Sequence, residues 1–227
     1  IESGTLAKLF ATRIELLKDA FYYEHNDRVW NGDGLAYGGG TDKSFLGIDN
    51  QIVTSPSSGS HGGLSRTTYD ELQNQQISGT SGPSADWEAD AWERMLTLKV
   101  AIMNHQAGKK GNVKPDFCTV TEGSYVDIIN LGYVQNTNVG VDVKDVESVS
   151  GIQFEVNHAQ DANTVYMGCT SGISIYYPEG WDGPIQLDIR DEFKDRMNLK
   201  DCIAIVKSEL CPIVEAPFMQ GVITSAG

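Results

Sequence analysis

Residues 5–26 carry hydrophobic side chains at the spacing of an α-helix. Apolar residues recur every three or four positions, at Leu6, Phe10, Ile14, Leu17 and Phe21. A second group widens the same face, and consists of Leu9, Leu16, Ala20 and Tyr23. The pattern predicts one long amphipathic helix of about 33 Å. The simplest interpretation of its wide apolar face is packing on a hydrophobic core.

Residues 84–106 show a second helical pattern. One apolar stripe repeats there, formed by Trp87, Ala91, Met95, Leu98 and Ile102. Ser84 can cap the start of this helix, and Gly108 can end it. A Trp and Met stripe at helical spacing is more typical of a core than of a cofactor site, so we expect this helix to be buried.

The region between and after these helices mixes short strands with turns. Short apolar runs predict strands at 115–120, 152–156, 163–167, 173–177 and 185–189. The strands 152–156 and 163–167 surround a turn at 158–161. A helix is expected to start at Thr121 and to end at Gly132. A β-branched run at 139–149 suggests strand or extended chain.

The chain closes on a long extended run at 202–223, interrupted by Pro212 and Pro217. Loops rich in Gly and Ser are expected at 29–43, 55–63 and 77–84, and the third is a plausible boundary. A long helix near one end and strands at the other, with a mixed region between them, predict an α+β fold with an insertion.

The composition narrows the possible partners. The chain has 227 residues, with 31 Asp and Glu against 17 Lys and Arg, and a formal net charge of -14. Tight nucleic-acid binding uses Lys and Arg to neutralise phosphates, so we expect no specific nucleic-acid binding. Such a surface could line a container of DNA without holding it, or could simply keep the chain soluble. No run is long enough to span a membrane.

Few residues suggest catalysis or metal binding. The chain has no CxxC pair, no HExxH, no G-x-S-x-G and no P-loop, and we expect no cofactor, no metal and no catalytic residue. An acidic group on the second helix, made up of Asp86, Glu88, Asp90 and Glu93, leaves open a hydrolase with an unrecognised site. The cysteines, at 118, 169, 202 and 211, favour assembly in a reducing compartment.

LGIDNQIV and GGLSRTTYDELQNQ, within 46–75, are similar to the "GLD…GGI-R-T" segment of one family, the HK97-like major capsid proteins of tailed bacteriophages. KPDFCTVTEGSYVDI, 114–128, resembles its strand–helix segment. GIQFEVNHAQDANTVYMGC, 151–169, resembles its paired strands, although it lacks the family's proline. Residues 191–224 resemble its closing strands, and the opening helix is similar to its spine helix.

The resemblance implies a division of the chain. A peripheral domain would hold residues 1–83, including the spine helix at 5–27, and the closing strands at 191–227. An axial domain would be inserted at 84–190. The function implied is structural: copies of the chain would form hexamers and pentamers in an icosahedral virion capsid, assembled in the host cytoplasm around the genome. Scaffolding, portal and decoration proteins would be further partners.

The family also places an N-terminal arm and an extended loop before the spine helix, and this sequence starts at the helix. Because the sequence also lacks an initiator Met, we expect a processed or trimmed product. Lys200 and Lys207 align with the family's cross-linking Asn and Glu, so no self-catalysed isopeptide bond is expected. Candidate subunit-interface residues are Trp30, Tyr37, Trp181 and Arg66. An encapsulin-type shell, which shares the fold, is the alternative.

Overall fold

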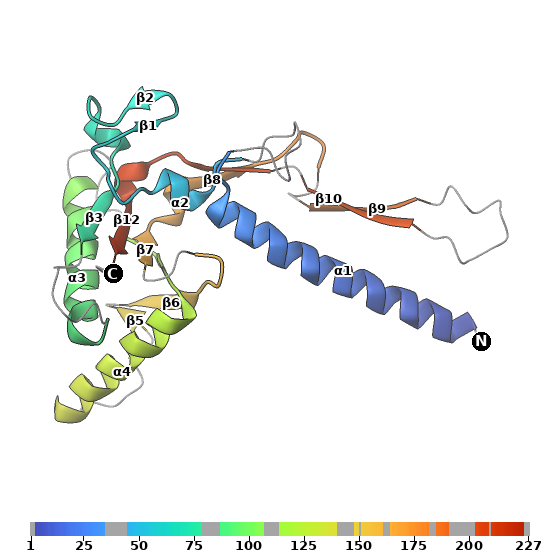
Figure 1. Cartoon of the computed structure of the whole chain (residues 1–227), viewed down its shortest axis with the longest axis horizontal. Helices are drawn as coiled ribbons and strands as arrows, with labels where there is room; N and C mark the ends of the chain where they lie inside the picture. The colour runs from blue at the N-terminus through green and yellow to red at the C-terminus, as the bar shows by residue number, and fades with distance from the viewer. Residues whose placement is uncertain are drawn as a thin grey trace.

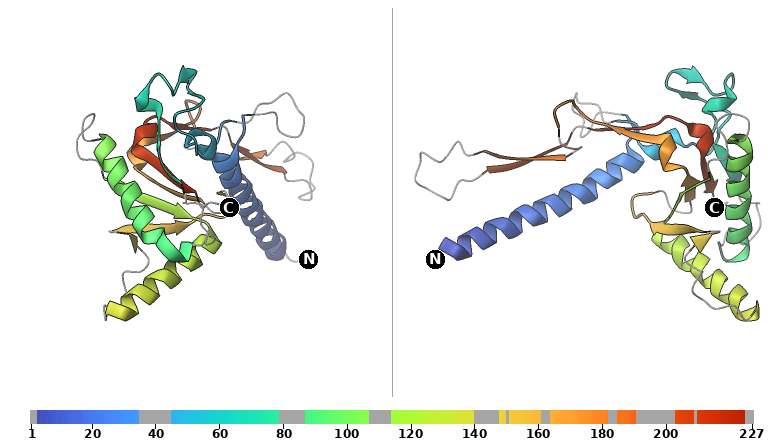
Figure 2. Two further views of the ribbon diagram at one scale, coloured as in Figure 1. Left: turned by 60° about the vertical axis from the view of Figure 1, so that its left-hand side comes forward. Right: turned by 180° about the vertical axis from the view of Figure 1, so that it is seen from behind.

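The computed structural model describes residues 3–34, 45–78, 87–106, 114–139, 148–149, 151–160, 164–181, 185–190, 203–208 and 210–224. Two elements extend from a compact body toward the same side (Figure 1). One is helix α1 (Ser3–Asn31). The other is the antiparallel pair of β9 (Ile185–Arg190) and β10 (Ile203–Ser208). The view from behind in Figure 2 shows both elements leaving the same end of the body.

Helix α1 confirms the predicted opening helix and is longer than expected. Its 29 residues give a rod of about 43 Å. The helix ends before Gly32, whose amide donates a hydrogen bond to the carbonyl of Arg28 at 2.9 Å. A Cβ at Gly32 would lie 2.7 Å from that same carbonyl oxygen, so the tight exit of the chain requires glycine.

A six-stranded sheet in the order β3-β12-β7-β4-β6-β5 forms the centre of the body. In sheet order the strands are β3 (Gln75–Ser78), β12 (Gln220–Thr224), β7 (Thr164–Gly168), β4 (Phe117–Val120), β6 (Ile152–Val156) and β5 (Ser148–Val149). The pairs β3–β12 and β4–β6 are parallel, and the other pairs are antiparallel. Every residue of β7 is buried, which agrees with its largely apolar sequence.

Helix α3 (Trp87–Gln106) covers one face of this sheet. Its predicted stripe is confirmed at the positions whose side chains are described, and Ala91, Met95, Leu98 and Ile102 are all fully buried. They pack against strand residues that point to the same face, among them Val165, Met167 and Ile223. A Cβ at Gly221 would lie 2.5 Å from a Leu98 methyl, so helix and sheet are in close contact.

Helix α4 (Glu122–Val139) packs against α3 and β6. Thr121 starts it as predicted, because its Oγ1 accepts a hydrogen bond from the Ser124 amide at 3.4 Å. The predicted end at Gly132 is wrong, because the helix continues through this residue to Val139. A glycine inside a helix costs only about 1 kcal/mol relative to Ala, which neighbouring contacts can offset.

The opposite face of the sheet supports a second core. Its buried residues come from the end of α1, from α2 (Ile48–Gln51), from β11 (Cys211–Val214) and from the sheet. They are Trp30, Ile48, Ile52, Ala159, Tyr166, Val214 and Val222. Tyr166 and Val222 alternate along their strands with residues that face α3, so the sheet is apolar on both sides.

Shorter elements lie beside the sheet in the described part of the chain. Strands β1 (Ser60–His61) and β2 (Leu64–Ser65) form a hairpin whose turn residues, Gly62 and Gly63, have φ of 57° and 80°. Both values suit glycine in a two-residue turn. Strand β8 (Ile173–Tyr176) pairs with β11. Among the described residues, 3₁₀ turns lie at η2 (Asp70–Leu72), η4 (Thr170–Gly172) and η5 (Pro217–Met219).

The sheet corrects two predictions about connectivity. Strands β6 and β7 form near the predicted positions, but they do not pair with each other, because β4 lies between them. The predicted loop at 77–84 is wrong at its start, where 77–78 belong to β3 and pair with β12. Strand β12 pairs with β7, and the Tyr166 hydroxyl donates a hydrogen bond to Asp49, so hydrogen bonds join residues 84–190 to both flanking segments. The division into two domains stays a prediction.

Candidate assembly surfaces

Trp30 anchors the end of α1 in the body. Only 9% of its surface is exposed, and its ring centroid lies 5.4 Å from that of Tyr166 in the sheet. The Tyr166 hydroxyl donates a hydrogen bond to Asp49 Oδ1 on α2. Asp49 and Tyr166 come from two of the segments that resemble capsid proteins, so the fold joins these segments directly. The structure places Trp30 inside the subunit, and an interface role for it stays a prediction.

Beside Trp30, the loop 157–160 holds the last turns of α1. The rings of Tyr23 and His158 stack with centroids 4.4 Å apart. Asn26 donates from Nδ2 to Asn157 Oδ1 at 3.2 Å, and Asn31 donates from Nδ2 to the Ala159 carbonyl at 2.5 Å. These contacts join the C-terminal third of α1 to the loop that follows β6, and they fix the direction in which the helix leaves the body.

The rest of α1 is largely exposed. Leu9, Leu16 and Tyr23 are 51%, 62% and 64% exposed, whereas Ile14 and Phe21 on the other side are half-buried. The prediction that all these residues form one face buried in a core is therefore wrong for Leu9, Leu16, Leu17, Ala20 and Tyr23, which are all exposed. Apolar residues lie around most of this helix. The helix meets the body at its C-terminal end, and the rest of it projects away from the body (Figure 1).

Arg66, the polar interface candidate, lies inside the body with 1% of its surface exposed. Its Nη1 donates to Asn74 Oδ1 at 3.1 Å, and its Nη2 donates to the Gln51 carbonyl at 2.6 Å. Burial lowers the pKa of the guanidinium below its usual range. Arg66 therefore joins its own segment to the end of α2 at Gln51 and to the segment that holds Asn74. An interface role for Arg66 stays a prediction.

Gln51 extends this buried polar network to β11. Its Nε2 donates to the carbonyls of Leu46 and Pro212 at 2.8 and 2.9 Å. Its Oε1 accepts a hydrogen bond from the Val214 amide at 2.8 Å. A buried polar side chain is stabilising only when its hydrogen bonds are made, and the printed sequence gives no sign of partners so far away.

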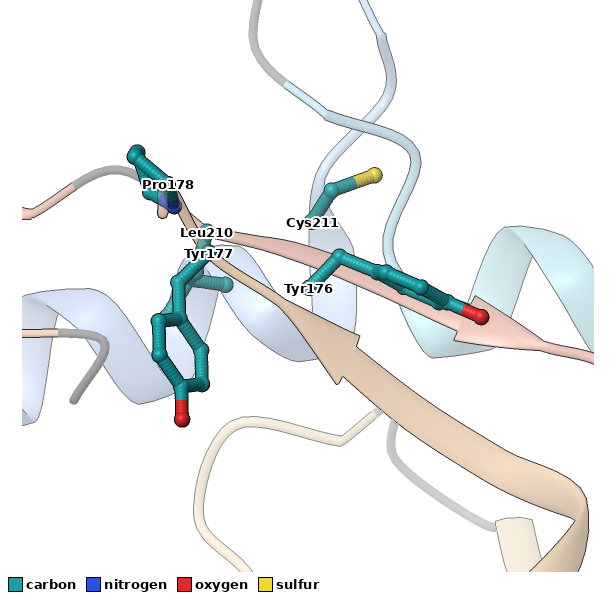
Figure 3. Close-up of a pocket in the computed structure, with 5 residues that line it drawn as sticks. All are labelled: Tyr176, Tyr177, Pro178, Leu210 and Cys211. Atoms are coloured by element: carbon teal, nitrogen blue, oxygen red, sulfur yellow. The ribbon is translucent and has the colours of Figure 1, made fainter. Parts of the chain in front are cut away.

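The β8–β11 ribbon carries the other exposed apolar surface near α1. Its end forms a shallow hollow lined by Tyr176, Tyr177, Pro178, Leu210 and Cys211, and the two tyrosine rings point in different directions (Figure 3). The two tyrosines are about half exposed, and the Tyr176 hydroxyl donates to Glu215 Oε1 at 2.5 Å. This hydrogen bond raises the pKa of Tyr176. An exposed patch of this kind marks a possible contact surface.

Trp181 and Tyr37 complete the interface candidates. Trp181 lies just beyond the ribbon and is partly exposed, and its amide donates to the Pro178 carbonyl at 3.3 Å. Tyr37 lies outside the described residues. An interface role for both stays a prediction. The structure adds candidates that the sequence did not reveal, namely the exposed residues of α1 and of the β8–β11 ribbon.

No group of three His, Cys, Asp or Glu side chains that could hold a metal occurs in the described part of the chain. Of the acidic group that suggested a hydrolase, only the Glu93 side chain is described, and it is exposed on α3. Burial, reinforced by Glu155, raises the pKa of the Cys118 thiol to about 12, so this thiol is a poor nucleophile. Cys118 and Cys211 are free thiols, the Cys169 thiol donates to the Lys114 carbonyl at 3.4 Å, and Cys202 lies outside the described residues.

Phage capsid chains and an encapsulin chain are among the solved structures that this chain resembles in fold. A chain of the cyanophage A-1(L) capsid asymmetric unit matches with a TM-score of 0.61 and 16% identity over 94% of this chain. A chain of the satellite phage P4 procapsid, which includes the size determination protein Sid, matches with 0.53 and 13% over 95%. The holo-SrpI encapsulin complex of Synechococcus elongatus PCC 7942 matches with 0.54 and 10% over 96%.

These likenesses define the class of fold. The chain has the HK97-like fold of phage capsid proteins, a fold that also occurs in an encapsulin. The chain spans 67%, 63% and 65% of the cyanophage, P4 and encapsulin chains respectively. No protein-family model and no curated protein sequence matches it. Among the described helices, none combines the length and apolar character needed to cross a bilayer.

Proposed function

We propose that this chain is the repeating subunit of a tailed-phage capsid, which self-assembles into the icosahedral shell around the genome. The observation that carries the proposal is the likeness to two phage capsid chains, since it extends over 94–95% of the sequence. The extended α1 supports it independently, because a helix with exposed leucines gains stability from a neighbouring subunit. The role is structural, with no catalytic step and no cofactor.

In this proposal, copies of the chain occupy hexamers and pentamers of a virion capsid that assembles in the host cytoplasm. Residues 84–190 form the axial domain, and the flanking segments form the peripheral domain. Trp181 and Tyr37 are interface candidates, while scaffolding, portal and decoration proteins are further partners. Each contact can be weak, because a closed shell repeats it many times.

The test is the mass of the purified chain, measured by light scattering on a sizing column and followed by electron microscopy. We expect rings or closed shells, whose mass is a multiple of 24.8 kDa. A chain that stays monomeric across the accessible concentration range contradicts the proposal. A variant that disrupts the body, Leu98→Asp, is the matched control, because particles seen with it would reflect aggregation rather than assembly.

An encapsulin-type shell is the second candidate, and the likeness to the SrpI encapsulin over 96% of the chain favours it. Particle contents distinguish the two functions, since a capsid encloses nucleic acid and an encapsulin encloses protein cargo. The net charge of -14 leads us to expect that DNA moves freely inside the shell. Retention of DNA by the purified chain at physiological salt would contradict that expectation.

A further inference from the structure

Three of the exposed apolar residues of α1 lie along one straight line. Leu9, Leu16 and Tyr23 are seven residues apart, which is close to two helical turns, so they lie along one stripe. The stacking of His158 on Tyr23 leaves 64% of this residue exposed. The stripe differs from the half-buried side that carries Ile14 and Phe21. It presents three large apolar side chains, each more than half exposed.

The charge of α1 suits contact with a second copy of itself. Within Ser3–Asn31 the basic residues are Lys8, Arg13, Lys18 and Arg28, and the acidic residues are Glu15, Asp19, Glu24 and Asp27. The helix is therefore neutral, whereas the whole chain has a net charge of -14. Two such helices can approach without the net repulsion that opposes contact between acidic parts of two copies.

The charges beside the stripe also favour one direction. With about 3.6 residues per turn, Arg13 and Glu24 lie on one flank of the stripe, and Lys8 and Asp19 lie on the other. All four side chains are exposed. Each flank has its basic residue nearer the start of α1 and its acidic residue nearer the end. Glu24 also pairs with Arg28 at 2.6 Å, and a carboxylate can accept from both.

In an antiparallel pair, each flank of the stripe lies against the same flank of the second copy, which runs in the opposite direction. Arg13 then lies nearest to Glu24 of the second copy, and Lys8 lies nearest to its Asp19. In a parallel pair, opposite flanks meet, so that the nearest neighbours become Arg13 with Lys8 and Asp19 with Glu24, each five positions apart along the axis. The nearest charges across the contact are then alike, whereas in the antiparallel pair they are opposite. Exposed pairs contribute only about 0.2–1 kcal/mol each, so they select the direction, while the apolar stripe supplies the contact.

We propose that the exposed stripe of α1 docks on the same stripe of a second copy, antiparallel, with Leu16 beside the twofold axis. Leu16 then meets Leu16, and Leu9 meets Tyr23 of the other copy. A twofold contact of this kind is self-complementary. The proposed helix pairing names one contact within the proposed shell. It rests on the proposed function only because both require that copies of the chain associate.

Cysteine cross-linking tests this geometry, because a disulfide requires Cβ atoms about 3.5–4.5 Å apart. The background is the full chain with Cys202→Ser and Cys211→Ser, which leaves the buried Cys118 and Cys169. Under mild oxidation, Leu16→Cys should form a disulfide-linked dimer on its own. Leu9→Cys and Tyr23→Cys should cross-link weakly alone and strongly when mixed. Tyr22→Cys is the matched control, because Tyr22 is 55% exposed but lies away from the stripe.

The outcomes separate this proposal from the proposed function. Particles that form without a Leu16→Cys cross-link overturn the helix pairing and leave the shell function intact. Cross-linked dimers that form no particles support the pairing and count against the shell. Strong self-cross-linking of Leu9→Cys, or cross-linking of Tyr22→Cys equal to that of Leu16→Cys, overturns the antiparallel geometry. Lys8→Glu should weaken the cross-link severalfold, and adding Asp19→Lys should restore it.

Discussion

The body and α1 use the same kinds of residues in opposite ways. On α3, Leu98 is fully buried between helix and sheet, whereas on α1 Leu16 is 62% exposed. The body buries its apolar side chains within one chain, in cores on both faces of its sheet. Helix α1 buries side chains mainly at its C-terminal end and leaves apolar residues exposed along the rest of its length. The difference teaches that stability resides in the body and that the apolar surface of α1 is available for contact with other chains.

The largest expected effect tests the body. Leu98→Ala removes a fully buried side chain, and we expect the free energy of unfolding to fall by about 2–5 kcal/mol. Leu96→Ala, two residues away on the same helix, removes a side chain that is 45% exposed and should cost less than half as much. Urea unfolding monitored by circular dichroism measures both. Equal losses would show that α3 is not packed as described.

The second prediction concerns the buried polar network. Arg66→Met keeps much of the side-chain volume but removes the donors to Asn74 and Gln51, and a buried acceptor without a donor costs about 1–3 kcal/mol. We expect a loss of that size in the free energy of unfolding. Arg13→Met on the exposed part of α1 is the control and should change it by less than about 0.5 kcal/mol. If both variants behave alike, Arg66 does not join the loops as the geometry indicates.

The sequence predicted the body better than its surroundings, for reasons that particular residues show. The stripe of Ala91, Met95, Leu98 and Ile102 is a local pattern, and local periodicity is enough to place a helix on a core. Strand pairing is not local, so nothing in 152–167 revealed that β4 lies between β6 and β7. Periodicity also found the apolar residues of α1, but it cannot show which of them another part of the chain covers.

The candidate site was harder to predict than the fold. The sequence suggests Trp30 and Arg66 as residues that contact another subunit, but the structure buries both within their own subunit. Trp30 packs on Tyr166, which is more than a hundred positions away, and Arg66 bonds to Asn74 and Gln51, which lie within fifteen positions. A burial decision of this kind depends on tertiary contacts. The sequence shows that Leu9, Leu16 and Tyr23 follow one another at intervals of seven residues. This spacing alone does not predict a contact surface, because only the structure shows that the three side chains are exposed.

A smaller effect is expected on acidification. His61 joins the β1–β2 hairpin to β11, with its Nε2 2.8 Å from the Val214 carbonyl, and burial together with nearby Arg66 lowers its pKa from the usual 6.5. The unfolded chain therefore binds this proton more readily, so the contribution of His61 is present above pH 6.5 and is lost as the pH falls through the lowered pKa. His25, whose pKa burial and Arg28 also lower, acts in the same direction.

Replacing this histidine tests the effect. His61→Gln retains an amide donor without a titrating group, so urea midpoints measured between pH 8 and pH 5 should fall less steeply than those of the unchanged chain. His25→Gln should reduce the slope in the same way, and the double variant should reduce it further. A slope that neither substitution alters would mean that other groups, such as carboxylates, control the acid sensitivity of the body.

The smallest expected change in stability is on α1, and it decides whether the comparison between body and helix holds. Leu16→Ser replaces a side chain that is 62% exposed, so the free energy of unfolding should change by less than about 0.5 kcal/mol, at a concentration where the chain is monomeric. Because the stripe is proposed to meet a second copy, the same substitution should raise the concentration needed for self-association, measured by light scattering. Lys18→Ser, on the other side of the helix, should leave that concentration unchanged. If Leu16→Ser instead destabilises the monomer as much as Leu98→Ala does, α1 is part of the folding unit, and its exposed stripe does not serve assembly.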